Sequence, residues 1–194
     1  MPKNFKGRKL ILTYAGRAID PMRATEDDID LTDIAHSTAN LCRYTGHVRK
    51  FYSVAEHSVR VSEYIERETG SISLALTGLM HDASEAYLGD VARPVKDNNE
   101  VGRLYKLAED KLMKLISKKF GTEWPLPEIV GFADYVLLRT EQRDLMPYPN
   151  DLYSLEDEPT LDKVIEPWGP EKAERKFLER YEILTLEAVL DQTF

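Results

Sequence analysis

The residues with the clearest chemical potential lie in one stretch, His81-Asp82-Ala83-Ser84-Glu85-Ala86-Tyr87-Leu88-Gly89-Asp90. It contains an adjacent imidazole and carboxylate, a second carboxylate at Glu85, and a third at Asp90 directly after a glycine. An apolar run, residues 74–80, leads into it. Charge at the end of a buried helix is costly unless a metal or a counter-charge neutralises it. The stretch therefore predicts a metal ligand pair, His81 and Asp82, although one could instead be a helix cap and the other solvated.

His57 is the second candidate ligand. At helical spacing its neighbours on the same face are Val54 and Val61, so the imidazole is expected to point along an apolar face. A metal ligand is expected to have such surroundings, and so is a core histidine that is hydrogen-bonded to a carbonyl group. His57 taken alone does not distinguish between these two alternatives.

Asp134 is the third candidate, again on an apolar helix face, with Val130 and Leu137 at helical spacing. A carboxylate there is costly unless it is paired or bound to metal. The plain alternative is a salt bridge to Arg139 or Arg43. Taken together, these positions supply two imidazoles and two carboxylates, a mixed nitrogen and oxygen site that suits Mn, Co, Fe, Ni or Zn.

The bulk composition limits the class of partner. The chain has 194 residues and a net charge of −8, from 26 basic and 34 acidic residues. This balance argues against a nucleic-acid polymer, which needs clustered Lys and Arg. The single cysteine, Cys42, fits a reducing compartment, and no signal peptide or membrane span is seen. We expect a cytoplasmic protein with no membrane partner.

Hydrophobic periodicity predicts the elements that position these groups. The fold class is all-α, with about six helices and a small N-terminal β element over residues 8–22. We expect one domain over residues 1–194, with a core at about 25–146 and a C-terminal loop and helix at 147–194. The last helix is strongly charged, and we expect it to be solvated or to pack against another subunit. The expected helices span residues 30–45, 53–68, 72–88, 100–119, 128–145 and 170–190, and Gly89 is expected to end the third of them. A long loop is expected at 147–170. The fourth helix is predicted from an apolar pattern at Val101, Leu104, Leu107, Leu112, Leu115 and Ile116.

The order His57, His81-Asp82, Asp134 resembles the HD-domain metal-dependent phosphohydrolases. Residues 54–58, 81–85 and 89–90, followed by Pro94-Val95-Lys96, look like the bacterial HD-domain 5′-deoxynucleotidases. Residues 30–43, 51–57 and 140–145 look closer to a phage and prophage branch that includes nucleotidases and dATP triphosphohydrolases. The resemblance covers about residues 25–146. It implies an HD-domain helical bundle, a homo-oligomer, a divalent metal cofactor and a small-molecule nucleotide substrate, with His57, His81, Asp82 and Asp134 as metal ligands.

The resemblance also suggests catalytic and substrate-binding residues. Glu85, one helical turn from the ligand pair, is the expected general acid/base or water-orienting group. The alternative is that Glu85 is a surface residue with no part in catalysis. Asp90 is expected to contact water, the leaving group or a sugar hydroxyl, or else to cap the next helix. Arg43 and Tyr44 match the family's arginine-aromatic pair, although a tryptophan is common at Tyr44, and Lys96 matches a phosphate-contacting lysine.

Other polar residues carry weaker expectations. His36, Asn40, Arg43 and His47 form one stripe on the expected helix 30–45, which is more often a solvated face. On the helix after Asp134, Glu141 and Arg143 are expected at the surface or behind the ligands.

Two reactions compete. The first is hydrolysis of deoxynucleoside 5′-monophosphates to nucleoside and phosphate. The second is hydrolysis of a dNTP, for instance dATP, with release of triphosphate, for which Arg49, Lys50, Arg93 and Lys96 could supply the extra cations. An alternative from another functional class is a non-catalytic nucleotide sensor or a structural metal site. The presence of both Glu85 and Asp90 argues against it, because a structural site needs neither.

Overall fold

The computed structural model describes residues 9–97, 100–147 and 158–191. Over these ranges the chain is mostly helical and carries one small two-stranded antiparallel sheet, as predicted. None of the helices in these ranges is both long and apolar enough to cross a bilayer. The expected loop at 147–170 lies partly outside the described residues, and 158–169 form neither helix nor strand. The α-helices are α1 (Leu31–Asn40), α2 (Val54–Thr69), α3 (Ile72–Met80), α4 (Glu85–Leu88), α5 (Arg93–Asp97), α6 (Glu100–Phe120), α7 (Glu128–Leu145) and α8 (Pro170–Asp191).

The sheet is a hairpin at the N-terminal end of the described chain. Strand β1 (Ile11–Leu12) pairs antiparallel with β2 (Ala18–Ile19), and the turn between them includes Gly16 at a φ of 78°. Glycine adopts this left-handed conformation without a steric penalty. The hairpin is tied to α1, because the backbone N–H of Ala15 donates a 2.6 Å hydrogen bond to the buried carboxylate of Asp33.

Helix α2 begins and ends where its sequence signals predict. The Ser53 side chain caps the first turn by accepting a hydrogen bond from the backbone N–H of Glu56. Gly70 ends the helix in the left-handed conformation, with a φ of 66°. This capping fixes the first turn of α2, and that turn carries His57.

The helix expected over residues 72–88 is interrupted. Helix α3 ends at Met80, a turn follows over 81–84, and the short α4 starts at Glu85. At the break a side-chain hydrogen bond replaces a backbone hydrogen bond, because the ring Nδ1 of His81 donates to the Gly78 carbonyl at 2.7 Å. In a continuous helix that carbonyl would accept from the backbone N–H of Asp82. The prediction of one helix was wrong, and the break places His81 and Asp82 at a helix end.

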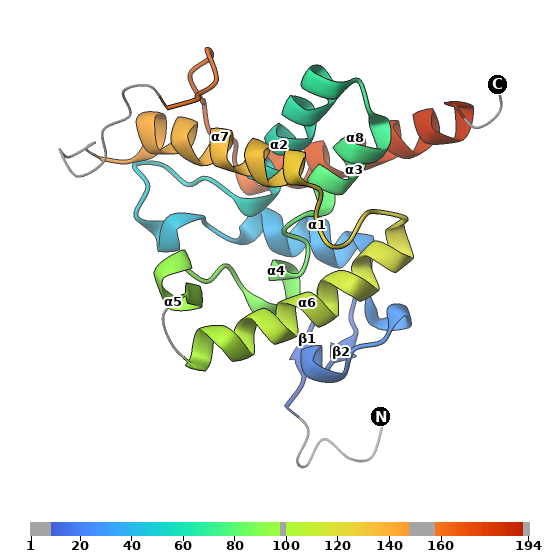
Figure 1. The fold of residues 1–194 in the computed structure, drawn as a ribbon. Helices are drawn as coiled ribbons and strands as arrows, with labels where there is room; N and C mark the ends of the chain where they lie inside the picture. The colour runs from blue at the N-terminus through green and yellow to red at the C-terminus, as the bar shows by residue number, and fades with distance from the viewer. Residues whose placement is uncertain (1–8, 98–99, 148–157, 192–194) are drawn as a thin grey trace.

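The C-terminal helix packs inside the molecule. Helix α8 lies against α1, α2 and α3, and its Ala173, Phe177 and Leu184 are buried. These apolar residues repeat at helical spacing, so the charged residues of α8 occupy its other faces. The expectation that this helix is solvated or packs against another subunit was therefore wrong for the face that enters the core. In Figure 1 the end of α8 projects from the body.

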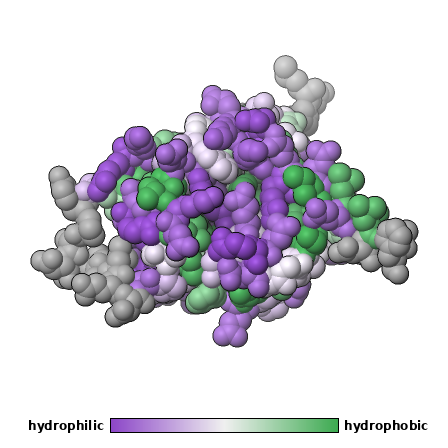
Figure 2. Space-filling model, turned by 90° about the horizontal axis from the view of Figure 1, so that it is seen from above, coloured by the Kyte–Doolittle hydropathy of each residue, from purple (hydrophilic) through white to green (hydrophobic). Residues whose placement is uncertain are grey.

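Two apolar stripes stay exposed. In α6, Leu112 and Ile116 are buried as predicted, whereas Val101, Leu104 and Leu107 are 55–66% exposed, because α6 meets the α3 part of the core only through its second half. Figure 2 shows further apolar surface near the projecting end of α8, where Ile183, Leu186, Val189 and Leu190 are exposed. Such patches often form contacts between proteins. The expected homo-oligomer stays a prediction.

Candidate metal centre

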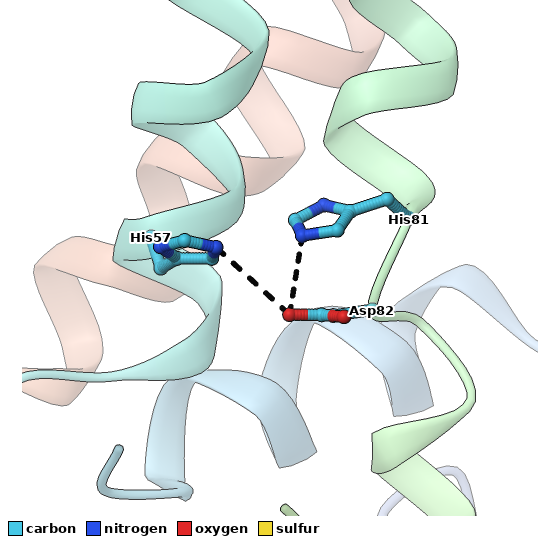
Figure 3. A group of neighbouring side chains, drawn as sticks. All are labelled: His57, His81 and Asp82. Carbon is cyan, nitrogen blue, oxygen red and sulfur yellow. Dashed lines mark ion pairs between the residues drawn. The ribbon is translucent and has the colours of Figure 1, made fainter. Parts of the chain in front are cut away.

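Three of the predicted ligands converge where α2 meets the end of α3. His57 projects from the first turn of α2, and His81 and Asp82 follow the last residue of α3 (Figure 3). The Asp82 Oδ2 atom is 3.2 Å from His81 Nε2 and 4.0 Å from His57 Nε2. One donor atom from each residue lies within 4.8 Å of the others. Atoms bound at roughly 2.1 Å around one ion lie roughly 3–4 Å apart, so this grouping fits a single divalent cation.

The histidine nitrogens support a metal rather than a purely structural role. Both Nε2 atoms are buried, and among the described residues neither has a hydrogen-bond partner of good geometry. Their Nδ1 atoms are occupied: that of His57 by Glu141 at 2.6 Å and that of His81 by the Gly78 carbonyl. A core histidine bonded to a carbonyl, the alternative for His57, is not what the structure shows. An imidazole whose Nδ1–H is donated behind it and whose Nε2 faces a carboxylate is arranged as a metal ligand.

Asp134 borders this group. It comes from α7, and its Oδ1 atom is 3.1 Å from His57 Nε2 while its Oδ2 atom is 3.5 Å from Arg93. Arg139, one of the suggested salt-bridge partners, pairs with Glu158 instead. Asp134 therefore contacts the ligand cluster through His57. It is not one of the three residues, His57, His81 and Asp82, whose donor atoms lie within 4.8 Å of one another.

The pKa values of the imidazoles and carboxylates of this cluster shift in opposite directions. Burial lowers the pKa of His81, but the adjacent Asp82 carboxylate more than reverses this and raises the pKa to about 9. The pKa of Asp82 is well below its usual range because the two imidazoles and Arg43 outweigh the effect of burial. Burial acts against ionisation of Asp134 as well, yet its contact with His57 brings its pKa down to about 2. The proton on His81 thus supplies positive charge where a cation would supply it.

A hollow of about 390 Å³ opens beside the ligands. Glu85 lines it and is 4% exposed; its Oε1 atom is 3.4 Å from Lys96 Nζ, and its Oε2 atom has no hydrogen-bond partner in the described chain. Burial, followed by repulsion from Asp82 and Asp90, raises the pKa of Glu85 to about 9. The surface alternative for Glu85 is excluded. The other lining residues are Arg43, Tyr44, Thr45, Asp82, Asp90, Val91, Ala92, Arg93, Pro94, Lys96, Asp134, Leu138 and Gln142.

Asp90 and two basic residues, Arg93 and Lys96, also line the hollow. Asp90 cannot cap α5 as the alternative suggested, because α5 starts three residues later, at Arg93. Burial raises the pKa of Asp90. Lys96 is held between Glu85 and Glu109, whose Oε1 atom is 3.0 Å away. Of the four cations suggested for a triphosphate, Arg93 and Lys96 line the hollow, whereas Arg49 and Lys50 do not.

Arg43 and Tyr44 reach the hollow from a turn rather than from a helix. Helix α1 ends at Asn40, so the expected polar stripe of four residues on one helix does not exist. His36 is partly exposed, and its ring stacks on Tyr14 at 3.6 Å and pairs with Glu174. Neither His36 nor His47 lines the hollow.

Glu141 has a larger part in the site than its sequence position suggested. It is 0% exposed and contacts His57, Arg43 and Tyr44. The surface alternative was therefore wrong, and Glu141 lies behind His57, one of the candidate ligands. One sequence signal was available: Glu141 lies seven residues after Asp134, two turns along the same face of α7. Arg143, by contrast, contacts Asp144 and the chain at 160–163.

The raised pKa of His81 leads to a pH prediction. The folded, metal-free chain holds a proton on His81 up to about pH 9, whereas the unfolded chain releases it near 6.5. Glu85 shifts in the same direction, so the metal-free chain loses stability as the pH rises from about 6.5 to 9. A metal that replaces the His81 proton binds more tightly over the same range. We expect the rise in melting temperature caused by Mn²⁺ or Zn²⁺ to be larger at pH 8.5 than at pH 6, measured against chelator-treated protein. Equal rises at both values would contradict the assignment of His81.

Comparisons with known proteins give relatives without a described activity. YfdR of Escherichia coli (strain K12), an uncharacterized protein, is 39% identical over 138 residues, covering 70% of this chain and 71% of YfdR. RCAP_rcc00048 of Rhodobacter capsulatus, also uncharacterized, is 35% identical over 139 residues, covering 68% of this chain and 70% of that protein. No protein-family model matches the chain.

Proposed function

We propose that this chain, which belongs to the same family as YfdR and RCAP_rcc00048, is a metal-dependent phosphohydrolase of the HD-domain type that acts on deoxynucleotides. The observation that carries the proposal is that the buried Nε2 atoms of His57 and His81 both face the Asp82 carboxylate, at 4.0 and 3.2 Å, with the Asp134 carboxylate 3.1 Å from His57. Two imidazoles and two carboxylates that meet in this way form a donor set suited to a divalent transition metal. The proposed reaction cleaves the 5′-phosphoester of a deoxynucleoside monophosphate to nucleoside and phosphate, and the free Cys42 fits the proposed cytoplasmic location.

The donor set fits a divalent cation such as Mn, Co, Zn, Fe or Ni, held by His57, His81 and Asp82 with Asp134 beside them. When bound, such an ion supplies a Lewis acid and a water of lowered pKa. The side chains that line the hollow would then bind the phosphate and transfer a proton.

Arg43 and Lys96 are suited to bind the phosphate. The Arg43 side chain is 11% exposed and lies 3.7 Å from Asp82, so a phosphate in the hollow meets its guanidinium group next to the ligands. A guanidinium group can grip two phosphate oxygens at once. Lys96 approaches from α5 with its charge partly balanced by Glu109, 3.0 Å away, and its Nζ atom also lies 3.4 Å from Glu85.

Glu85 is suited to move the proton. Because its pKa is raised to about 9, it carries a proton at neutral pH in the metal-free chain. A buried, protonated carboxyl group can donate to the ester oxygen that leaves, and the resulting carboxylate can then accept a proton from water. Asp90, on the same wall, is placed to contact a sugar hydroxyl or the leaving group.

A triphosphohydrolase acting on dNTP, possibly dATP, is the second candidate. The observation that favours it is Arg93, whose side chain is 66% exposed and lines the hollow, so that the hollow has a third cation besides Arg43 and Lys96. Both reactions break the same ester bond. They differ in how many phosphates the cations must neutralise.

The test is a product analysis with Mn²⁺, Co²⁺ and Zn²⁺ against every dNMP and dNTP, with products separated by chromatography. We expect nucleoside and inorganic phosphate from monophosphates. Release of intact triphosphate would select the second candidate. No turnover of any nucleotide by protein that demonstrably binds metal would overturn both candidates and favour a nucleotide sensor. Asp82→Ala protein, purified in parallel, controls for contaminating phosphatase.

A further inference from the structure

The two oxygens of the buried Glu141 carboxylate face two different functional groups. Oε1 accepts a hydrogen bond from His57 Nδ1 at 2.6 Å. Oε2 accepts from Arg43 Nε at 3.1 Å and from the Tyr44 hydroxyl at 2.9 Å. One side chain from α7 thus joins an expected metal ligand on α2 to the expected phosphate-binding turn after α1.

A second buried glutamate shows that this arrangement is not a general way of satisfying a carboxylate. Glu56, next to His57 in the sequence, is also 0% exposed. Its partners are Arg60 and the backbone N–H of Trp168, and neither belongs to the site. Glu56 thus holds α2 against the segment before α8, whereas the partners of Glu141 in the described chain, His57, Arg43 and Tyr44, are residues of the site.

The turn that Glu141 holds has an unusual backbone. Tyr44 and Thr45 have φ values of 57° and 53°, a left-handed conformation that is uncommon for residues other than glycine. Two such residues in succession persist only when contacts outside the turn hold them there. The Tyr44 hydroxyl and the Arg43 guanidinium make such contacts with Glu141 Oε2, and the backbone carbonyls of Leu138 and Tyr52 accept further hydrogen bonds from these two residues.

We infer that Glu141 is a positioning residue that aligns His57 for the metal through one carboxylate oxygen and Arg43 with Tyr44 for the phosphate through the other. Its contact with Nδ1 leaves Nε2 of His57 as the nitrogen available to a cation. Its contact with Arg43 fixes the guanidinium 3.7 Å from Asp82. The inference rests on the proposed function for the phosphate, but its link to the metal does not require turnover.

The experiment measures two affinities separately in Glu141→Gln. Metal affinity is measured by competition with a chelator in the absence of phosphate, and inorganic phosphate affinity is then measured at saturating metal. The amide cannot accept hydrogen bonds at both ends, so we expect metal affinity to fall about 10–100-fold, as for other outer carboxylates, and phosphate affinity to fall as well. The matched control is Glu56→Gln, which removes an equally buried charge and should leave metal affinity within about twofold of the parent.

Three results would overturn the inference. The first is metal binding by Glu141→Gln that equals that of the parent. The second is an equal loss of metal affinity in Glu56→Gln. The third is a loss of metal affinity in Glu141→Gln without a loss of phosphate affinity. If Glu141→Gln does not fold, Glu141→Asp, which withdraws both oxygens by one methylene, is measured in the same way. Nitrogen-15 NMR of the zinc-loaded parent gives a further check: His57 should carry its proton on Nδ1, and zinc bound to Nδ1 would refute the assignment. A parent that binds metal and phosphate but hydrolyses no nucleotide would refute the proposed function and leave this inference standing.

Discussion

Asp82→Ala is expected to lose metal binding and, with it, all measurable hydrolysis. Asp82 Oδ2 is the atom on which both imidazoles converge, and it also lies 3.7 Å from Arg43. Its removal leaves the buried, positively charged groups without their common counter-ion and deprives the cation of its central carboxylate. We expect metal affinity to fall by more than about 100-fold, which exceeds the usual effect of losing an outer-sphere carboxylate. Isothermal titration with Mn²⁺ or Zn²⁺ checks the affinity, and circular dichroism checks that the variant is folded.

The matched control for this variant is Asp33→Asn. Asp33 is also a buried carboxylate, 2% exposed, but it serves the hairpin by accepting the N–H of Ala15. Asparagine keeps an acceptor oxygen, so this variant should bind metal like the parent. If Asp82→Ala retained the affinity of the control, the ligand set proposed here would be wrong. Asp134→Ala, measured beside them, tests whether the carboxylate next to His57 is a fourth ligand, in which case its metal affinity also falls.

The sequence predicted the helices with strong boundary signals and missed features that depend on side-chain contacts between segments. Ser53 and Gly70 delimit α2 by local capping, which sequence alone reveals. The break after Met80 depends on a hydrogen bond from the His81 ring to Gly78, and no propensity predicts that bond. The inward face of α8 was missed because its charged residues outnumber the buried Ala173 and Phe177.

The same distinction holds for the site. His57, His81 and Asp82 were predicted from residue types and apolar spacing, and the structure brings them together. The contacts of Glu141 within the site were not predicted, because a glutamate among polar residues near the end of a helix usually faces solvent. Its role becomes visible only when the turn at Arg43 folds against α7, a contact between residues about one hundred positions apart.

Glu85→Gln is expected to bind metal like the parent and to lose about 100- to 10,000-fold in turnover. The side chain is 4% exposed, lines the hollow and, with its pKa raised to about 9, retains a proton near neutral pH. The amide has nearly the same shape and cannot exchange that proton with the leaving group or with water. Single-turnover hydrolysis at saturating metal measures the loss, and a metal titration confirms that the ligands are intact.

The control must separate proton transfer from the effect of Glu85 on Lys96. Glu109→Gln serves this purpose, because Glu109 contacts the same Lys96 Nζ, at 3.0 Å against 3.4 Å for Glu85, and does not line the hollow. If Glu85 acts only by holding Lys96, the two variants should slow hydrolysis to a similar extent. If Glu85 transfers the proton, Glu109→Gln should lose less than about tenfold, and Glu85→Gln should also lose the limb of the pH–rate profile that reports a carboxyl group. Full turnover by Glu85→Gln would remove Glu85 from the mechanism and leave Asp90 as the remaining carboxylate of the hollow outside the ligand cluster.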